Sequence, residues 1–173
     1  MRGRFRFVSR SIAAAALAVV GMSAPALAAP LPRIVSMNVC TDQLLLPLAD
    51  PAQILGLSRF SRDAWQSWAA ADARHYPSLS GGAEDVLVLK PDIVLASLFD
   101  KRSTRELLKA QGLRLAELSV PRNLDEVKAQ IRKMGEIVQH RDRAEAEIAR
   151  LDAAMTRARP RQTPSSTSLS RAP

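Results

Sequence analysis

The sequence predicts an α/β fold, with a mostly parallel four-stranded sheet flanked by helices. Short apolar runs rich in β-branched residues recur at 33–37, 54–57, 93–96 and 113–118. Stretches with helical periodicity separate these runs, and alternating strands and helices favour a parallel sheet with helices on both faces. The polar tail at 159–173 has no apolar periodicity, so it is predicted to be disordered.

Residues 1–28 are predicted to be a cleavable secretory signal peptide. Four arginines begin it without an acidic residue between them: Arg2, Arg4, Arg6 and Arg10. An apolar run at 11–24 follows, and residues 25–28 offer a small-x-small cleavage pattern. The run is shorter than the roughly 20 residues that a bilayer span needs. No cysteine follows the cleavage site, so the sequence predicts export without a lipid anchor.

The net charge of +8 does not indicate a nucleic-acid binder, because the charges are unevenly placed. All 17 acidic residues lie between Asp42 and Asp152. Residues 33–152 hold 17 basic residues, and the other eight lie in the signal peptide and at 157–171. A basic stripe with interleaved aromatic residues is absent, so no nucleic-acid partner is expected. About 145 residues remain after cleavage, which suffices for one domain.

The first half of the chain contains two of the predicted strands. Residues 33–37 form a buried strand, 38–40 a loop, and Thr41 or Asp42 caps a helix that runs through Leu48. Residues 54–57 form the second strand. The stretch at 58–79 has weaker periodicity, with Trp65 and Trp68 three apart on a short helix, where they would share one face.

The second half repeats the pattern with clearer helix boundaries. Gly81-Gly82 breaks the chain before a helix at 83–89, which Lys90-Pro91 ends. After the third strand, residues 103–106 read as a capping box for a helix that Gly112 closes, and 113–118 form an edge strand. Asn123 caps the next helix. Two one-faced helices end the pattern, with apolar positions Val127, Ile131, Met134 and Val138, then Ala144, Ile148, Leu151 and Met155.

Ligands of parallel sheets bind outside the carboxyl ends of the strands, which brings the loops at 38–40, 59–62 and 97–100 to one rim. The candidate ligand-binding residues are therefore Asn38, Val39, Cys40, Arg59, Phe60, Arg62, Trp65 and Ser97. Trp65 and Trp68 are open to two interpretations, core packing or the apolar wall of a ligand cleft. The same choice holds for Phe60.

No catalytic or cofactor motif is found. The sequence has no glycine-rich dinucleotide or phosphate loop and no Gly-x-Ser-x-Gly elbow. One cysteine and two histidines, His75 and His140, show no metal-ligand spacing, so neither a metal nor a cofactor is predicted. Cys40 is expected to be buried and inert. An enzyme is not predicted, although a secreted α/β enzyme for a small polar substrate stays an alternative.

Three short segments and one longer segment resemble a known family. The short ones are Arg33-Ile34-Val35-Ser36, Thr41-Asp42-Gln43-Leu44 and Ile54-Leu55-Gly56-Leu57-Ser58; the longer one runs from Ala83 through Lys90-Pro91-Asp92 to Ala96. This order, over residues 33–157, is similar to the start of the periplasmic binding proteins for ferric siderophores, haem and vitamin B12. The resemblance implies a Rossmann-like lobe of a bilobal, monomeric carrier that serves an ABC importer in the periplasm.

The resemblance also assigns roles to two residues. The family glutamate that pairs with arginines on the membrane permease corresponds to Glu84, so Glu84 is expected to dock the permease. A favourable contact with the helix dipole is the simpler interpretation of this residue. Phe60 falls where an aromatic residue lines the cleft of the vitamin B12 binder. Ser78 stands near the position of a cleft tryptophan of that binder, and the loop at 37–40 is longer, which argues against vitamin B12.

The length departs most from the family, whose members have a second lobe of similar size. The expected domains are an N-terminal lobe at 29–140, an interlobe helix at 141–158 and the tail at 159–173, with the second lobe missing. The change of composition near Arg157 suggests truncation or a change of reading frame. The apolar face of the last helix should then lack part of its cover, and one lobe should bind ligand weakly. A sensor or interaction module of the same fold is a further alternative.

Overall fold

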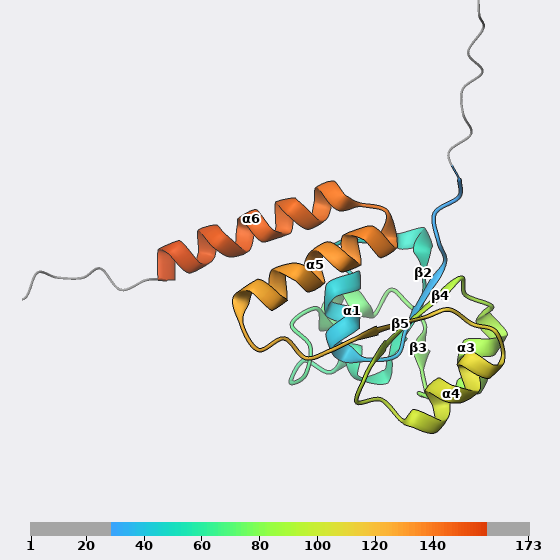
Figure 1. Ribbon diagram of the computed structural model, residues 1–173. Helices are drawn as coiled ribbons and strands as arrows, with labels where there is room; N and C mark the ends of the chain where they lie inside the picture. Colours follow the sequence, from blue (N-terminus) through green and yellow to red (C-terminus); the bar gives the residue numbers. More distant parts are fainter. Residues whose placement is uncertain (1–28, 159–173) are drawn as a thin grey trace, which may run out of the picture.

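The computed structural model describes residues 29–158, which form a parallel sheet between two layers of helices (Figure 1). The strands are β1 (Ile34–Ser36), β2 (Ile54–Ser58), β3 (Ser78–Leu79), β4 (Ile93–Ser97) and β5 (Leu115–Leu118). Their order is β3-β2-β1-β4-β5, and every neighbouring pair is parallel. The predicted α/β class is confirmed.

The sheet has one strand more than the four predicted. The additional strand is β3, in which Ser78 and Leu79 pair with Leu57 and Ser58 of β2. Two residues are too few to show an alternating pattern, so the sequence gives no signal for this strand. Its position matters for the site, because it brings the loop that follows Leu79 to the carboxyl edge of the sheet.

Within the described residues, six helices and two 3₁₀ turns accompany the strands, and the last two helices follow the last strand. The helices are α1 (Val39–Leu45), α2 (Ala70–Ala73), α3 (Ala83–Leu89), α4 (Arg102–Ala110), α5 (Leu124–Val138) and α6 (Arg141–Ala158). The 3₁₀ turns are η1 (Pro51–Gln53) and η2 (Arg59–Arg62). None of the helices within residues 29–158 is both long enough and apolar enough to cross a membrane. The predicted signal peptide and disordered tail lie outside the described residues.

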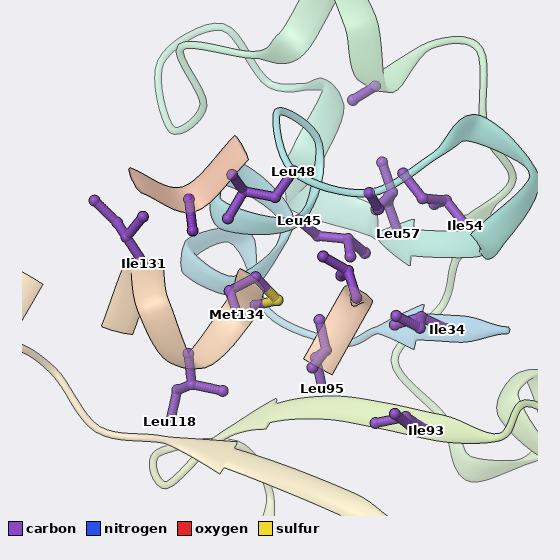
Figure 2. Close-up of a cluster of buried hydrophobic side chains, with 14 of the residues drawn as sticks. Ile34, Leu45, Leu48, Ile54, Leu57, Ile93, Leu95, Leu118, Ile131 and Met134 are labelled. Atoms are coloured by element: carbon purple, nitrogen blue, oxygen red, sulfur yellow. The ribbon is translucent and has the colours of Figure 1, made fainter. Parts of the chain in front are cut away.

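The core has two parts, one on each face of the sheet. On one face α1, α5 and α6 cover Ile34, Leu57 and Leu95, with Met134 of α5 in the middle of the cluster (Figure 2). On the other face α3 and α4 cover Val35 and Val94. Alternate residues of β1 and β4 point to opposite faces, which explains why these strands read as unbroken apolar runs.

The predicted helix ends are confirmed in part. Asn123 caps α5, since its side chain accepts a hydrogen bond from the backbone N–H of Glu126 at 2.9 Å. The capping box predicted at residues 103–106 is wrong. Helix α4 is capped by Lys101, two residues before the predicted cap Ser103, and Lys101 makes no side-chain capping bond. Gly112 follows α4 with a positive φ of 81°, as expected of a glycine that ends a helix.

Helices α5 and α6 pack closely where Gly135 faces Ala144. A Cβ atom added at position 135 would lie 2.5 Å from Cβ of Ala144, so only glycine allows this approach. Ala144 and Ile148 of α6 are buried against α5, whereas Met155, near the end of α6, is 41% exposed. As predicted, the apolar face of the last helix is covered at its beginning and open toward its end.

Candidate functional site

The site lies at the carboxyl edge of the sheet, where the strand order reverses. The chain proceeds outward from β1 to β2 and β3, then returns to place β4 on the other side of β1. At such a switch point the loops after β1 and β4 diverge and leave a crevice. Asn38 follows β1 and Asp100 follows β4, and Nδ2 of Asn38 donates to Oδ1 of Asp100 at 2.9 Å. The two loops are therefore tied together across the switch point.

Asn38 also begins α1, which corrects the predicted cap at Thr41 or Asp42. Oδ1 of Asn38 accepts from the backbone N–H of Cys40 at 2.9 Å. Thr41 donates back to the carbonyl of Asn38 at 2.8 Å. Only two residues separate β1 from α1, so Cys40 lies in the first turn of the helix. Its thiol is exposed, and the prediction of a buried cysteine is wrong.

Asp42 lies beneath the rim and is fully buried. Its carboxylate accepts from Oγ of Ser58 at 2.5 Å and from the backbone N–H of Ser58 at 3.2 Å. Burial away from water raises the pKa of Asp42 to about 6, and the hydrogen bonds from Ser36 and Ser58 offset only part of this effect. This carboxylate holds the end of β2 against α1. The turn that contains Arg59 and Phe60 begins directly after Ser58.

The turn after β2 holds three of the predicted ligand-binding residues, Arg59, Phe60 and Arg62. The guanidinium of Arg59 lies 4.6 Å from the ring centroid of Phe60, a cation–π contact that orients both side chains. Arg62, in the same turn, donates instead to the carbonyl of Tyr76 and so binds the turn to the chain before β3. Ser61 is buried and donates to the carbonyl of Ser58 at 2.7 Å, which holds the turn in place.

A cavity of about 240 Å³ opens at this edge, and we call it the rim hollow. It lies among the loops after β1, β2, β3 and β4. Its lining residues are Met37, Ser58, Arg59, Phe60, Ser80, Gly81, Gly82, Asp100, Lys101 and Thr104. Arg59 and Phe60 are the two that the sequence identified. The rest lie at or after the carboxyl ends of strands, so their place at this edge follows from the strand order once β3 is known.

The other predicted ligand-binding residues do not line the rim hollow. Asn38 and Ser97 both donate to the carboxylate of Asp100, which does line the hollow. The bond from the backbone N–H of Ser97 to Oδ2 of Asp100 is 2.7 Å long. Val39 and Cys40 lie on the first turn of α1. Arg62 bonds elsewhere, and Trp65 is 98% exposed in the loop before α2. The structure thus brings together about a quarter of the predicted set.

The two tryptophans are neither core residues nor neighbours on a helix. Trp65 and Trp68 lie in the turns before α2, and both are exposed. The backbone N–H of Trp68 donates to Oε1 of Gln43 at 3.1 Å. Trp68 borders a mostly apolar groove of about 400 Å³ that lies among α1, α5 and α6 and includes Cys40, Leu44 and Ile131. The prediction that the pair lies on a short helix is wrong.

Glu84 lies in the first turn of α3, next to the rim hollow. It is exposed, and among residues 29–158 no cation lies within ion-pair distance of its carboxylate. A Cβ atom at position 82 would overlap Oε2 of Glu84, so glycine at this position leaves room for the carboxylate. The neighbouring Asp85, in contrast, has a hydrogen-bond partner: its Oδ2 accepts from the backbone N–H of Ser80 at 2.6 Å.

The side chains that line the rim hollow are suited to binding a solute. It offers hydroxyl groups, two cations, one carboxylate and one aromatic ring. Neither His75 nor His140 lines it, and no group of side chains within the described residues could hold a metal ion. Such a surface can hold a solute by hydrogen bonds, charge and stacking.

Three comparisons with known proteins bear on this fold. The family model described as "Periplasmic binding protein" matches residues 34–168, a range that continues past α6 into the tail. A search of the curated proteins gives no match. Many solved structures are similar, and the three described next are under 25% identical to the chain, so they bear on the fold alone.

A periplasmic haem-binding protein from Pseudomonas aeruginosa is 23% identical, with a TM-score of 0.64 over 73% of this chain and 46% of the other. An ABC-type Fe³⁺-hydroxamate transport protein from Saccharomonospora viridis is also 23% identical, with a TM-score of 0.57 and coverage of 74% and 50%. A periplasmic vitamin B12 binding protein from Vibrio cholerae is 18% identical, with a TM-score of 0.56 and coverage of 74% and 49%.

The chain thus spans about half the length of these proteins. Family members are periplasmic binding proteins and not enzymes, so the alternative of a secreted enzyme is set aside. With a family match over most of its length and the α/β fold of these carriers, the chain belongs to the periplasmic binding protein family.

Proposed function

We propose that this chain is the solute-binding component of an ABC importer in the periplasm. It captures an iron siderophore, haem or a corrinoid at the rim hollow and delivers it to a membrane permease. The observation that carries this proposal is the hollow itself, open at the switch point of a periplasmic binding protein fold. Residues 29–140 then form the first lobe, and α6 is the helix that leads from it toward a second lobe.

Within the rim hollow, Arg59 and Phe60 are the proposed contacts with the solute. Asn38 and Ser97 are positioning residues, because both donate to the carboxylate of Asp100 that lines the hollow. The solved structures with the same fold include proteins whose names specify haem, a ferric hydroxamate or vitamin B12, which supports this range of ligands.

Titration of the exported chain, residues 29–173, tests the proposal. Haem, ferric siderophores and cobalamin are added separately, and binding is followed by calorimetry and by the fluorescence of Trp65 and Trp68. Both tryptophans are exposed, and these coloured ligands absorb at their emission. We expect at least one ligand to bind, weakly, because a one-sided hollow encloses only part of a solute. Absence of binding by every ligand at high micromolar concentrations contradicts the proposal.

A pair of phenylalanine variants locates the binding site. Phe60→Ala removes a ring that lines the rim hollow, so we expect the affinity to fall about tenfold, or about 1.4 kcal/mol. Phe99→Ala is the matched control, since Phe99 follows β4 on the same edge, is 79% exposed and does not line the hollow. If Phe99→Ala weakens binding as much as Phe60→Ala, the solute binds elsewhere on the rim.

Glu84 is proposed to dock the chain onto the permease. The carboxylate of Glu84 is exposed and has no ion pair among residues 29–158, so it is available to an arginine of a partner. Such pairs set orientation and the speed of encounter. We expect Glu84→Arg to weaken binding to the purified permease at least tenfold, roughly the cost of replacing an attraction by a repulsion. Solute affinity should stay unchanged, because Glu84 does not line the rim hollow.

The control for this variant is Asp125→Arg. Asp125 is an exposed acid in the first turn of α5, as Glu84 is in the first turn of α3. Both reversals place a cation at a helix amino end, at a cost under about 1 kcal/mol. Equal loss of permease binding in the two variants assigns the effect to net charge or helix stability and contradicts docking through Glu84.

A further inference from the structure

The two cations of the rim hollow have no acidic partner within the described residues. Arg59 and Lys101 both line the hollow, and neither takes part in an ion pair or donates a side-chain hydrogen bond there. By contrast, Arg105 and Lys109 of α4 are both paired with Glu117. The stacking of Arg59 on Phe60 limits where the guanidinium can go and leaves its N–H groups free.

Of the described residues, Asp100 is the one acid that lines the hollow, and both of its carboxylate oxygens already accept hydrogen bonds. Oδ1 of Asp100 accepts from Asn38, and Oδ2 accepts from the backbone N–H of Ser97. Both oxygens therefore point into the loop network that ties β1 to β4. Two further acids lie nearby on α3, where Asp85 is held by Ser80 and the exposed Glu84 does not line the hollow.

Hydroxyl groups complete a set of donors. Oγ of Ser80 accepts from the backbone N–H of Gly82 at 3.2 Å, so its own hydrogen is free to be donated to a ligand. Thr104 lines the hollow from the first turn of α4. Guanidinium, ammonium and hydroxyl donors in one small cavity are the combination that binds carboxylate, phenolate or phosphate oxygens.

We propose that the rim hollow binds an anionic group of its solute through Arg59 and Lys101, so that the chain selects negatively charged chelates. This inference rests on the proposed function and narrows it. Haem, with two carboxylates, and ferric tricatecholates, with three negative charges, fit this chemistry. Neutral ferric trihydroxamates carry no net negative charge, and cobalamin is neutral overall, with its single phosphodiester as the only anionic group. The aromatic ring of Phe60 adds a stacking surface that either class could use.

The test compares two ferric chelates of similar size and different charge. A ferric tricatecholate and a neutral ferric trihydroxamate are titrated into the exported chain by calorimetry, with haem and cyanocobalamin as a second pair. We expect the anionic member of each pair to bind at least tenfold more tightly at 50 mM salt. Its affinity should fall at 500 mM salt, because salt screens charges on an open surface, while the affinity of the neutral member stays constant.

Charge-removing variants assign the effect to the two side chains. Arg59→Gln and Lys101→Gln are each expected to weaken the tricatecholate about tenfold or more, the usual worth of a hydrogen bond to a charged group. The trihydroxamate should be affected far less. Arg74→Gln and Arg102→Gln are the matched controls, since both are exposed arginines outside the hollow, and Arg102 directly follows Lys101. They remove the same net charge and should leave both affinities within twofold.

Three outcomes contradict the inference in different ways. Binding of the trihydroxamate as tight as that of the tricatecholate, or tighter, overturns the selection of anions and leaves the proposed function standing. Equal losses in the control variants overturn the role of Arg59 and Lys101, because net charge then explains the effect. No binding by any of the four ligands overturns the proposed function together with this inference.

Discussion

Replacing Met134 with alanine is expected to lower the free energy of unfolding by about 2–5 kcal/mol. Met134 is fully buried in the middle of α5, and Figure 2 shows it among Leu95, Leu118 and Leu45 from the sheet and α1. The variant loses the transfer free energy of the buried side chain. It also leaves a cavity that the surrounding sheet and helices cannot fill. Urea unfolding followed by circular dichroism measures the change.

Met155→Ala is the matched control for this variant. It makes the same substitution in the neighbouring helix α6, where the side chain is 41% exposed. We expect a change of less than about 0.5 kcal/mol, the usual size for an exposed position. A loss at Met155 as large as that at Met134 would mean that the end of α6 is covered in solution, for example by a second molecule. Protein concentration would then affect the unfolding midpoint.

The stability of the chain is expected to fall as the pH rises from 5 to 7.5, and Asp42 is the reason. Its pKa is about 6 in the folded protein against 3.8 when exposed. Folding therefore favours the protonated carboxyl, and the stability it contributes is complete below pH 3.8 and lost as the pH rises through 6. Over this interval the free energy of unfolding should decrease by roughly 1–2 kcal/mol.

Asp42→Asn isolates this contribution. Asparagine keeps a carbonyl oxygen for the N–H of Ser58 and cannot ionise, so the difference in stability between pH 5 and 7.5 should shrink by roughly 1–2 kcal/mol relative to the unmodified chain. Five other carboxyl groups with shifted pKa values do not interfere in this window. The pKa is lowered in Asp50, Asp63, Asp85, Glu117 and Glu145, so they lose their stabilising effect only in more acidic solution. An unchanged pH dependence in Asp42→Asn would show that another group is responsible.

Ser58 connects the titrating carboxyl group of Asp42 to the rim hollow. It is buried, donates to Asp42 from both its backbone and its hydroxyl, and lines the rim hollow directly before Arg59. Protonation of Asp42 weakens the acceptor for these two bonds. Solute affinity measured at pH 5 and 7.5 in both proteins therefore reports whether the carboxylate also positions Arg59 and Phe60.

Most of the elements could be predicted from local patterns. The strand that begins at Ile93 is a continuous apolar run, and the helix that ends at Val138 repeats its apolar residues every three or four positions. These signals are local because a periodic face reports which side of an element is buried. Strand β3 could not be predicted because two residues show no periodicity. The break at Gly81-Gly82 is visible in the sequence, but its position at the rim depends on β3.

Wrong predictions concern residues whose surroundings are set by distant parts of the chain. Cys40 was expected to be buried because its residue type usually is, yet the helix that begins at Val39 turns it outward. Trp65 and Trp68 were weighed as core or cleft residues by size, and the turns before α2 leave both exposed. Residue type gives an average tendency for burial, whereas the packing of neighbouring elements decides each case.

The sequence by itself determined the order of strands and helices, the neutral charge of the part between the two termini, and the resemblance to periplasmic binding proteins. Each of these three properties can be recognised from stretches of consecutive residues. Only the tertiary structure decided that Lys101 and Thr104 face Arg59, that Asp42 is buried against Ser58, and that Asn38 meets Asp100. These pairs are up to 62 positions apart in the chain. The contacts of Asp100, Lys101 and Thr104 depend on the crossover that returns β4 to the side of β1, a property of the folded sheet and not of any local pattern.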